Sequence, residues 1–145
     1  MKRISVLLAD NNRIVRRELR TMLEHEEELV VVGEASNGRQ AVAMVKKLRP
    51  ALVLMDVAMP LVNGLLATRQ ILKAAPATKV LMLSAHKDEV YVEEAMKSGA
   101  MGYLVEQTCA GSVCLAIREV AKGNSFFSPS IPKRLHKRNG RTQMA

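Results

Sequence analysis

Four polar residues stand directly after short apolar runs, and their types and spacing could do chemistry. The clearest case is LVLMDVAMP at residues 52–60, where four apolar residues lead straight into a carboxylate. The four polar residues are Asp10, Asp56, Ser84 and Glu106. In an open parallel α/β sheet, ligands bind beyond the carboxyl ends of the strands. One strand-end aspartate can be a mere helix cap, but four such residues favour a shared site, where clustered carboxylates raise at least one pKa.

The elements that must position these residues follow from the apolar pattern. Five runs are predicted as strands, at residues 4–9, 29–32, 52–55, 80–83 and 103–105. Each interval between them holds apolar residues at helical spacing. Asp88 is placed to cap the fourth predicted helix, and Gly99 is placed to end it. Alternating helices and near-continuously apolar strands predict an α/β fold, a (βα)5 parallel sheet covered on both faces.

Composition narrows the class of protein. The chain has 145 residues, of which 48% are hydrophobic, so it can bury one core, and the absence of Trp makes that core aliphatic. It contains no apolar run of about 18 residues that could cross a membrane. The basic, then apolar N-terminus is too short for a signal peptide. We therefore expect a cytoplasmic protein with no membrane contact.

Several longer motifs occur in a fixed order along the chain. They are LLAD at 7–10, VGEA at 32–35, LRP at 48–50, LVLMDVAMP at 52–60, TKVLMLSA at 78–85, DEVYVEEAMKSGAMGYLV at 88–105, AIREVAKGN at 116–124 and SPSI at 128–131. In this order the sequence resembles the receiver domain of two-component response regulators. Its details are most similar to the receivers of LuxR-type transcription regulators, which carry a helix-turn-helix output domain. The resemblance covers residues 2–129 and implies a flavodoxin-like, doubly wound five-stranded sheet with strand order 2-1-3-4-5.

The resemblance also implies roles for the strand-end residues. Asp56 would accept a phosphoryl group from a sensor histidine kinase, which is chemically reasonable for a carboxylate when a cation offsets the developing charge. The family holds Mg2+ for this purpose. The residues that match the family's site are Asp10, Asp56 and the Ala58 backbone carbonyl for the metal, Ser84 and Tyr103 for the switch, and Pro60 and Gly64 for the loop after the phosphoacceptor.

Two positions depart from the family's pattern inside this site. The acidic pair after the first strand should read Asp-Asp, and it reads Asp10-Asn11. The lysine after Val105 should bind the phosphoryl oxygens, and Glu106 stands there instead. An amide keeps an oxygen donor but loses a charge, so Mg2+ should bind more weakly. An anion in place of a cation opposes phosphoryl transfer, so self-catalysed phosphotransfer and dephosphorylation at Asp56 should be impaired.

The sequence leaves three arrangements of Glu106 open. The side chain could point into solvent, or it could replace Asn11 as a metal ligand. In the third arrangement a neighbouring base neutralises the site, and the candidates are Arg13, His86 and Lys87.

The end of the chain is strongly basic. It carries Lys133, Arg134, Lys137, Arg138 and Arg141 after Pro129, with no acidic residue. We expect residues 1–128 to form the receiver. Residues 129–145 would then be a solvated basic tail or a truncated linker, without an output domain. Contact with DNA would require such a domain, since a bare basic tail binds nucleic acid unspecifically.

Three classes of function compete. The first is a phosphorylation switch in transcription regulation, which is not an enzyme in the ordinary sense and has a sensor histidine kinase and a weak homodimer as partners. The second is a degenerate pseudo-receiver that binds proteins without phosphorylation. The third is a small nucleotide-binding or hydrolytic enzyme, which is disfavoured because ADNNRIV, and not a glycine-rich loop, follows the first strand.

Overall fold

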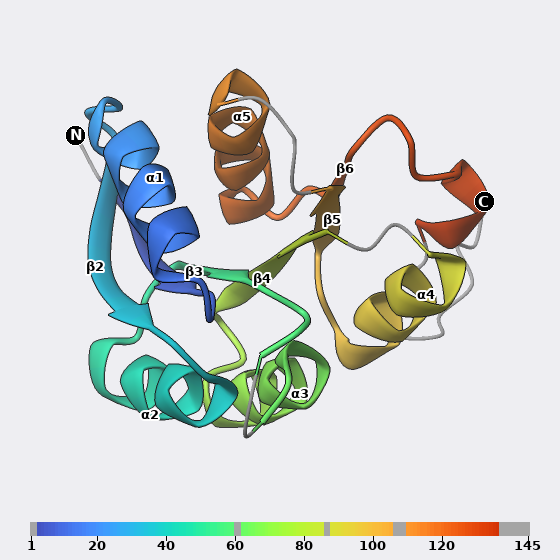
Figure 1. The fold of residues 1–145 in the computed structure, drawn as a ribbon, viewed down its shortest axis with the longest axis horizontal. Helices are drawn as coiled ribbons and strands as arrows, with labels where there is room; N and C mark the ends of the chain where they lie inside the picture. The colour runs from blue at the N-terminus through green and yellow to red at the C-terminus, as the bar shows by residue number, and fades with distance from the viewer. Residues whose placement is uncertain (1–2, 60–61, 86–87, 106–109, 137–145) are drawn as a thin grey trace.

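The computed structural model describes residues 3–59, 62–85, 88–105 and 110–136, and it places a single parallel sheet at the centre of the molecule (Figure 1). Its strands are β1 (Ile4–Ala9), β2 (Leu29–Ala35), β3 (Leu52–Met55), β4 (Lys79–Ser84), β5 (Gly102–Val105) and β6 (Phe126–Phe127). They pair in the order β2-β1-β3-β4-β5-β6, and every pair is parallel. The predicted fold class and the order 2-1-3-4-5 are confirmed.

The sixth strand corrects the prediction of a five-stranded sheet. Phe126 and Phe127 pair with Gly102 and Tyr103 along the outer edge of β5. Two residues are too few to show either a strand or a helix period, so the sequence pattern could not reveal this strand. The sheet therefore extends past α5 (Ala110–Ala121) to residues that the sequence assigns to the end of the receiver.

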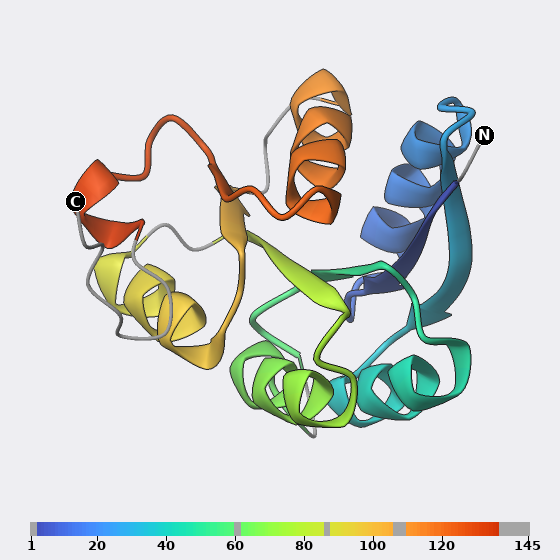
Figure 2. The same ribbon diagram turned by 180° about the vertical axis from the view of Figure 1, so that it is seen from behind.

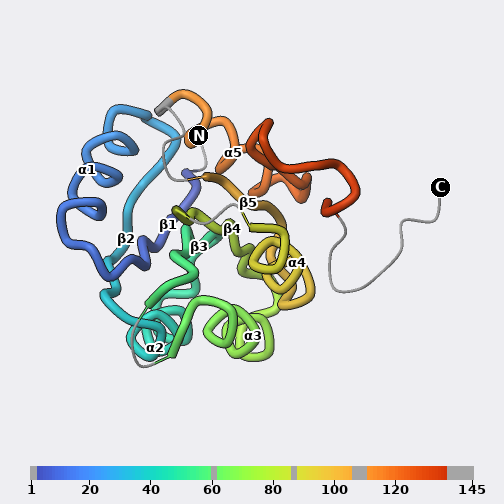
Figure 3. The backbone as a smooth tube through the Cα atoms, turned by 45° about the vertical axis from the view of Figure 1, so that its right-hand side comes forward, coloured from blue at the N-terminus to red at the C-terminus, as the bar shows by residue number. Residues whose placement is uncertain are grey.

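Helices cover both faces of the sheet, as Figures 2 and 3 show. The helices α2 (Gly38–Leu48), α3 (Gly64–Ala74) and α4 (Glu89–Ser98) lie on one face, and α1 (Arg13–Glu24) and α5 lie on the other. Alternate residues of each strand serve the two faces: in β1, Leu7 packs with the α2–α4 layer and Leu8 with the α1–α5 layer. Among the described residues no helix is long and apolar enough to cross a bilayer.

Asparagine caps start three of the helices next to the carboxyl edge of the sheet. The side chains of Asn12, Asn37 and Asn63 each accept a hydrogen bond from a backbone N–H in the first turn of α1, α2 and α3. Asp88 stands at the N-cap position of α4 as predicted, but its side chain makes no hydrogen bond to the first turn, which is fully described. Gly99 ends α4 with φ 106, the left-handed conformation that glycine adopts without strain.

The chain after β6 is packed against the protein up to the end of the described residues. A single 3-10 turn, η1 (Lys133–Leu135), lies beside α4. Ile131 and Leu135 are only 3% and 7% exposed and belong to the core cluster under α2–α4. Two residues of the segment expected to be solvated are therefore buried, whereas its basic residues Lys133 and Arg134 are exposed. The basic composition of the segment did not indicate that Ile131 and Leu135, four positions apart, would be buried in the core.

Candidate functional site

Asp56 follows β3 at the carboxyl edge of the sheet, and its side chain is partly exposed. Its backbone N–H donates to the carbonyl of Ala9 at 2.8 Å, which ties the end of β3 to the end of β1. Its Oδ1 atom accepts a hydrogen bond from the Ala58 N–H at 3.1 Å. A carboxylate held in this way is oriented but accessible, as a nucleophile or a metal ligand must be.

Gly64 allows the chain after Asp56 to turn back closely. Its N–H donates to the Val57 carbonyl at 2.8 Å. A Cβ atom on Gly64 would lie 2.2 Å from the Asp56 carbonyl oxygen and 2.8 Å from the Val57 Cα. Only glycine fits this approach, so residue 64 allows the loop after Asp56 to fold back against the end of β3. Pro60, the other predicted loop residue, lies outside the described residues.

Asp10 follows β1 and is the neighbouring carboxylate at the same edge. It is 4% exposed, and its Oδ1 atom accepts a hydrogen bond from the Asn12 N–H at 2.8 Å. Its backbone carbonyl accepts a 2.6 Å hydrogen bond from Arg16 Nη1. Asn11, which takes the place of the family's second acid, is exposed, and it is Asn12 that caps α1. The sequence analysis did not assign that capping role.

Ser84 and Tyr103 form a buried pair on adjacent strands. Both residues are 0% exposed, and their hydroxyl groups are hydrogen-bonded to each other. Ser84 is thus fully buried. Burial raises the pKa of the Tyr103 phenol; the Ser84 hydrogen bond opposes this shift, while the charges of Asp88 and Asp56 add to it. The phenol therefore stays protonated at neutral pH and keeps its hydrogen-bonding proton.

The positions of three further predicted residues lie outside the described part of the chain. These are Glu106, His86 and Lys87. Arg13, the remaining candidate base, is exposed at the first position of α1. The carboxylates that the structure brings to one edge are therefore Asp10 and Asp56, with Ser84 and Tyr103 on the neighbouring strands β4 and β5.

The donor set at this edge suits a hard cation. Asp10 and Asp56 offer carboxylate oxygens after adjacent strands, and Ala58, two residues after Asp56, offers a backbone carbonyl. Oxygen atoms of these kinds are what Mg2+ prefers. Within the described residues no cluster of three or more Asp, Glu, His or Cys side chains could hold a metal. Two acids and a carbonyl fit the ion, so the ligands already proposed from the sequence remain the candidates.

An arginine pair stands behind Asp10 and was missed by the sequence analysis. Arg16 Nε binds Glu34 Oε1 at 3.0 Å, and Arg20 Nε binds Glu34 Oε2 at 2.7 Å. The hydrogen bond from Arg20, and then that from Arg16, hold the pKa of Glu34 below its usual range, against an opposing effect of burial. Because Arg16 also binds the Asp10 carbonyl, this cluster fixes the end of β1 to α1 and β2.

We expect Glu34→Gln to lower the free energy of unfolding by about 1 kcal/mol at pH 7, as for a partly exposed ion pair. The folded-state pKa of Glu34 is depressed, so its contribution is present above the ordinary glutamate pKa near 4.5. It is lost as the pH falls through the folded-state value. Urea unfolding between pH 7 and pH 3 should therefore show the two proteins converging on the acid side.

The matched control is Glu24→Gln, which breaks only the exposed Arg20–Glu24 pair on α1. That change should cost a few tenths of a kcal/mol, roughly as other helix-surface pairs do. A loss at Glu34→Gln no larger than in this control would show that the cluster does not stabilise the end of β1.

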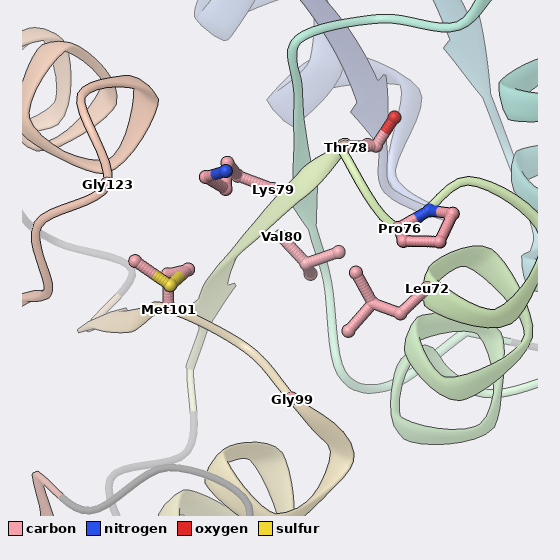
Figure 4. Close-up of a pocket in the computed structure, with 8 residues that line it drawn as sticks. All are labelled: Leu72, Pro76, Thr78, Lys79, Val80, Gly99, Met101 and Gly123. Atoms are coloured by element: carbon pink, nitrogen blue, oxygen red, sulfur yellow. The ribbon is translucent and has the colours of Figure 1, made fainter.

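A pocket of the protein lies at the opposite edge of the sheet and is separate from these residues. Figure 4 shows its lining, in which Leu72 and Val80 approach each other below the start of β4 and Met101 stands just before β5. Lys79 begins β4, whereas Ser84 ends it. This hollow is therefore at the amino end of the strands, away from Asp56.

Most of the chain matches a known protein family. The family model for the response regulator receiver domain matches residues 6–118. The chain belongs to that family. It is 37% identical over 135 residues to the transcriptional regulatory protein DegU of Brevibacillus brevis, and the match covers 93% of this chain and 57% of that protein. It is 38% identical over 128 residues to LnrK of Bacillus subtilis (strain 168), covering 88% and 58%.

A solved structure agrees with the fold of this receiver. The crystal structure of a two-component response regulator of the LuxR family from Aurantimonas sp. SI85-9A1 matches with a TM-score of 0.85 and 28% identity. The match covers 90% of this chain and 93% of that one. This chain spans little more than half the length of the two transcriptional regulators named above. It is a receiver domain of two-component systems, of the kind found in transcriptional regulators, and receivers of this family bind Mg2+ at their acidic pocket.

Proposed function

We propose that this receiver accepts a phosphoryl group on Asp56 from a sensor histidine kinase. The observation that carries the proposal is the position of Asp56, a partly exposed carboxylate after an inner strand, with Asp10 after the strand on one side and Ser84 after the strand on the other. A carboxylate oxygen of Asp56 would attack the phosphorus in line. The new P–O bond forms as the P–N bond to the kinase imidazole breaks.

Asp10, Asp56 and the Ala58 carbonyl would hold Mg2+, with Asn11 in place of the usual second acid. The ion, when bound, neutralises negative charge on the phosphoryl oxygens during transfer. The Ala58 N–H, at 3.1 Å from Asp56 Oδ1, keeps the carboxylate oriented toward the approaching group. Asn11 removes a negative charge from the proposed metal site, and Glu106, which follows Val105 in the sequence, replaces the family's lysine by an acid. Both changes should weaken Mg2+ binding or slow the transfer.

Ser84 and Tyr103 would transmit the effect of phosphorylation from Asp56 to α4. Ser84 ends β4, the strand next to the one that Asp56 follows, and its hydroxyl already binds the Tyr103 phenol. A phosphoryl oxygen on Asp56 is an acceptor that Ser84 could donate to, so phosphorylation would alter the partner of Tyr103. Because Tyr103 packs in one cluster with Val92 and Met96 of α4, the signal would reach that helix.

The output would be transcription, through a DNA-binding domain that follows the receiver in a longer protein or through a partner. The relatives named above are transcriptional regulators, and this chain covers little more than half of each. The boundary that we propose at residue 128 separates the sheet of the receiver from a short segment that still packs against it. The proposed partners are therefore a sensor histidine kinase and, through an output domain, DNA, and the proposed location is the cytoplasm.

Labelling with acetyl phosphate and Mg2+, followed by intact mass, tests the phosphoacceptor. We expect the wild type to gain the mass of one phosphoryl group and Asp56→Asn to gain none, because an amide cannot form the acyl phosphate. The control is Asp88→Asn, which removes an exposed carboxylate near the same edge and should label as the wild type does. A modified mass in Asp56→Asn would show that the assignment is wrong. No labelling of the wild type at any Mg2+ concentration would favour the pseudo-receiver.

We also propose a weak homodimer through the groove between α1 and α5. The groove has a volume of about 560 Å3 and is lined by Arg17, Glu18, Thr21, Met22, His25, Glu26, Gly111 and Cys114. Its walls carry both signs of charge, so two copies related by a twofold axis can pair basic with acidic residues. Leu115, which follows the groove residue Cys114 in α5, is 45% exposed and would offer apolar surface to a second copy.

Light scattering over a range of concentrations tests this association. We expect the weight-average mass of the wild type to rise at high concentration, and Met22→Glu to keep the protein monomeric by placing a charge in the apolar part of the groove. The control is Leu66→Glu, an exposed leucine of α3 on the other face of the sheet. A strict monomer at the highest concentration would remove the homodimer from the proposal.

A further inference from the structure

The segment that follows β6 is bound to the strand that carries Tyr103. We call residues 128–136 the clasp. The Ser128 N–H donates to the Tyr103 carbonyl at 3.0 Å, and the Val105 N–H donates to Ser128 Oγ at 2.8 Å. Ser128 is 4% exposed. Ser128 therefore hydrogen-bonds to the backbone of the two residues that flank Leu104, at the carboxyl end of β5.

The other end of the clasp is bound to α4. Arg134 of η1 makes an ion pair with Glu89 in the first turn of α4. Leu135 and Ile131 are buried in the same core cluster as Val92 and Met96 of α4. The His136 ring lies within hydrogen-bonding distance of the Ile131 carbonyl, at 3.1 Å, and it stacks on Phe127 with ring centroids 3.7 Å apart and an interplanar angle of 8°.

The two attachments meet at Tyr103. Its ring is completely buried in the cluster that also contains Ile131 and Leu135, together with Val92 and Met96 of α4. Its hydroxyl reaches Ser84 on the phosphoacceptor side of the same cluster. A close-packed cluster of this kind resists partial rearrangement. An outward movement of the Tyr103 ring would leave the apolar anchors of the clasp without part of their contact surface.

We propose that the clasp is a phosphorylation-sensitive strap on α4, held closed by the buried position of Tyr103. This inference rests on the proposed function, because the signal that it reads is a phosphoryl group on Asp56. Closure covers the surface of α4 beneath η1 and fixes the point at which the chain leaves the receiver. The clasp thereby couples Asp56 to whatever follows residue 136 or binds α4.

The direction of the coupling follows from the hydrogen-bonding capacity of Ser84. A hydroxyl has one proton to donate and two lone pairs with which to accept. When the phosphoryl group accepts the Ser84 proton, the Ser84 oxygen is left to accept from the Tyr103 phenol, and hydrogen bonds in such a chain strengthen one another. Phosphorylation should therefore favour buried Tyr103 and the closed clasp. By linkage, closing the clasp must favour the phosphorylated form to the same degree.

Amide hydrogen exchange on the full chain tests the coupling through three clasp amides. The N–H groups of Ile131, Leu135 and His136 donate to carbonyls within the clasp. We expect labelling with acetyl phosphate and Mg2+ to slow their exchange, and Tyr103→Phe to speed it on the order of tenfold, a typical size for such coupling. The amides of α1 are the internal control and should not change, because α1 packs in the other core cluster, which does not contain Tyr103, Ile131 or Leu135.

Two clasp variants test the reverse direction. Leu135→Ala removes a buried anchor, and Arg134→Ala removes the ion pair with Glu89; both should lower the fraction of Asp56 that is labelled at a given acetyl phosphate concentration. The matched control is Lys133→Ala, which removes one charge from an exposed position in the same turn and should label as the wild type does. Arg134→Ala leaves the core intact, so its labelling tests the reverse coupling even if Leu135→Ala does not fold.

The outcomes separate the two proposals. Equal clasp exchange in the wild type and in Tyr103→Phe would overturn the coupling, whether or not Asp56 is labelled. Labelling that leaves clasp exchange unchanged would also overturn it. Failure of the wild type to label, together with faster clasp exchange in Tyr103→Phe, would reject the proposed phosphoacceptor and would support the mechanical link between Tyr103 and the clasp.

Discussion

Replacing Glu106 by lysine should raise the rate of Asp56 labelling by acetyl phosphate on the order of a hundredfold, the effect typical of one preorganised charge contact in a transition state. Residue 106 directly follows β5, which ends at Val105 on the same edge of the sheet as Asp56. Negative charge gathers on the phosphoryl oxygens during transfer. A carboxylate there opposes that charge, and a partly desolvated pocket strengthens the repulsion several-fold over its value in water.

Asn11→Asp is the comparison that separates a charge effect from a metal effect. Asn11 still offers an oxygen, and Asp10, Asp56 and the Ala58 carbonyl remain to hold the ion. We therefore expect Asn11→Asp to raise the labelling rate less than Glu106→Lys and to lower the Mg2+ concentration needed for half-maximal labelling. The double variant should label fastest, since it restores the charge balance usual in the family.

Other results would change the assignment. Equal labelling of the wild type and of Glu106→Lys would mean that Glu106 lies away from the phosphoryl group. Rescue by Asn11→Asp alone would place the deficit at the metal. Rapid labelling of the wild type would show that neither substitution impairs this receiver.

Five of the strands were predictable from the sequence because each contains a short apolar run, and four of these runs are followed directly by a polar residue. β1 and β3 have the predicted bounds, whereas β2 ends three residues later, β4 extends by one residue at each end and β5 starts one residue earlier than predicted. The alternation of strands and helices indicates a parallel sheet. β6 was not predictable, since its two residues are held by pairing with Gly102 and Tyr103 and not by their own pattern.

The candidate site was predictable only in part, because strand ends reveal which residues converge but not how each is bonded. The placement of Asp10 and Asp56 on neighbouring strands follows from strand order. The burial of Ser84 against Tyr103 depends on the packing of α4 over β5, and the pairing of Arg16 with Glu34 joins residues 18 positions apart. Likewise, Ile131 and Leu135 are anchors only because α4 offers them a surface, which a basic composition does not disclose.

Replacing Gly64 by alanine should strongly destabilise the loop that follows Asp56. The new methyl group would lie 2.2 Å from the Asp56 carbonyl oxygen, 2.8 Å from the Val57 Cα and 3.0 Å from the Asp56 carbonyl carbon. All three atoms belong to the backbone, so no side-chain rotation relieves the clash. The loop itself must move, and we expect the free energy of unfolding to fall by about 3 kcal/mol, at the upper end for overpacking.

The same change should slow the labelling of Asp56 in the fraction that remains folded. The clash displaces the backbone of Asp56, the proposed phosphoacceptor, and misplacement of a reacting group by about 1 Å can cost on the order of a hundredfold in rate. Gly111→Ala is the matched control, because a Cβ there meets nothing within 4 Å in α5. Alanine in a helix is favoured over glycine by roughly 0.5–1 kcal/mol, so this control should be neutral or more stable and should label normally. Urea unfolding and intact mass on the two variants would decide the point, and equal stability of Gly64→Ala and Gly111→Ala would show that the loop after Asp56 is free to relax.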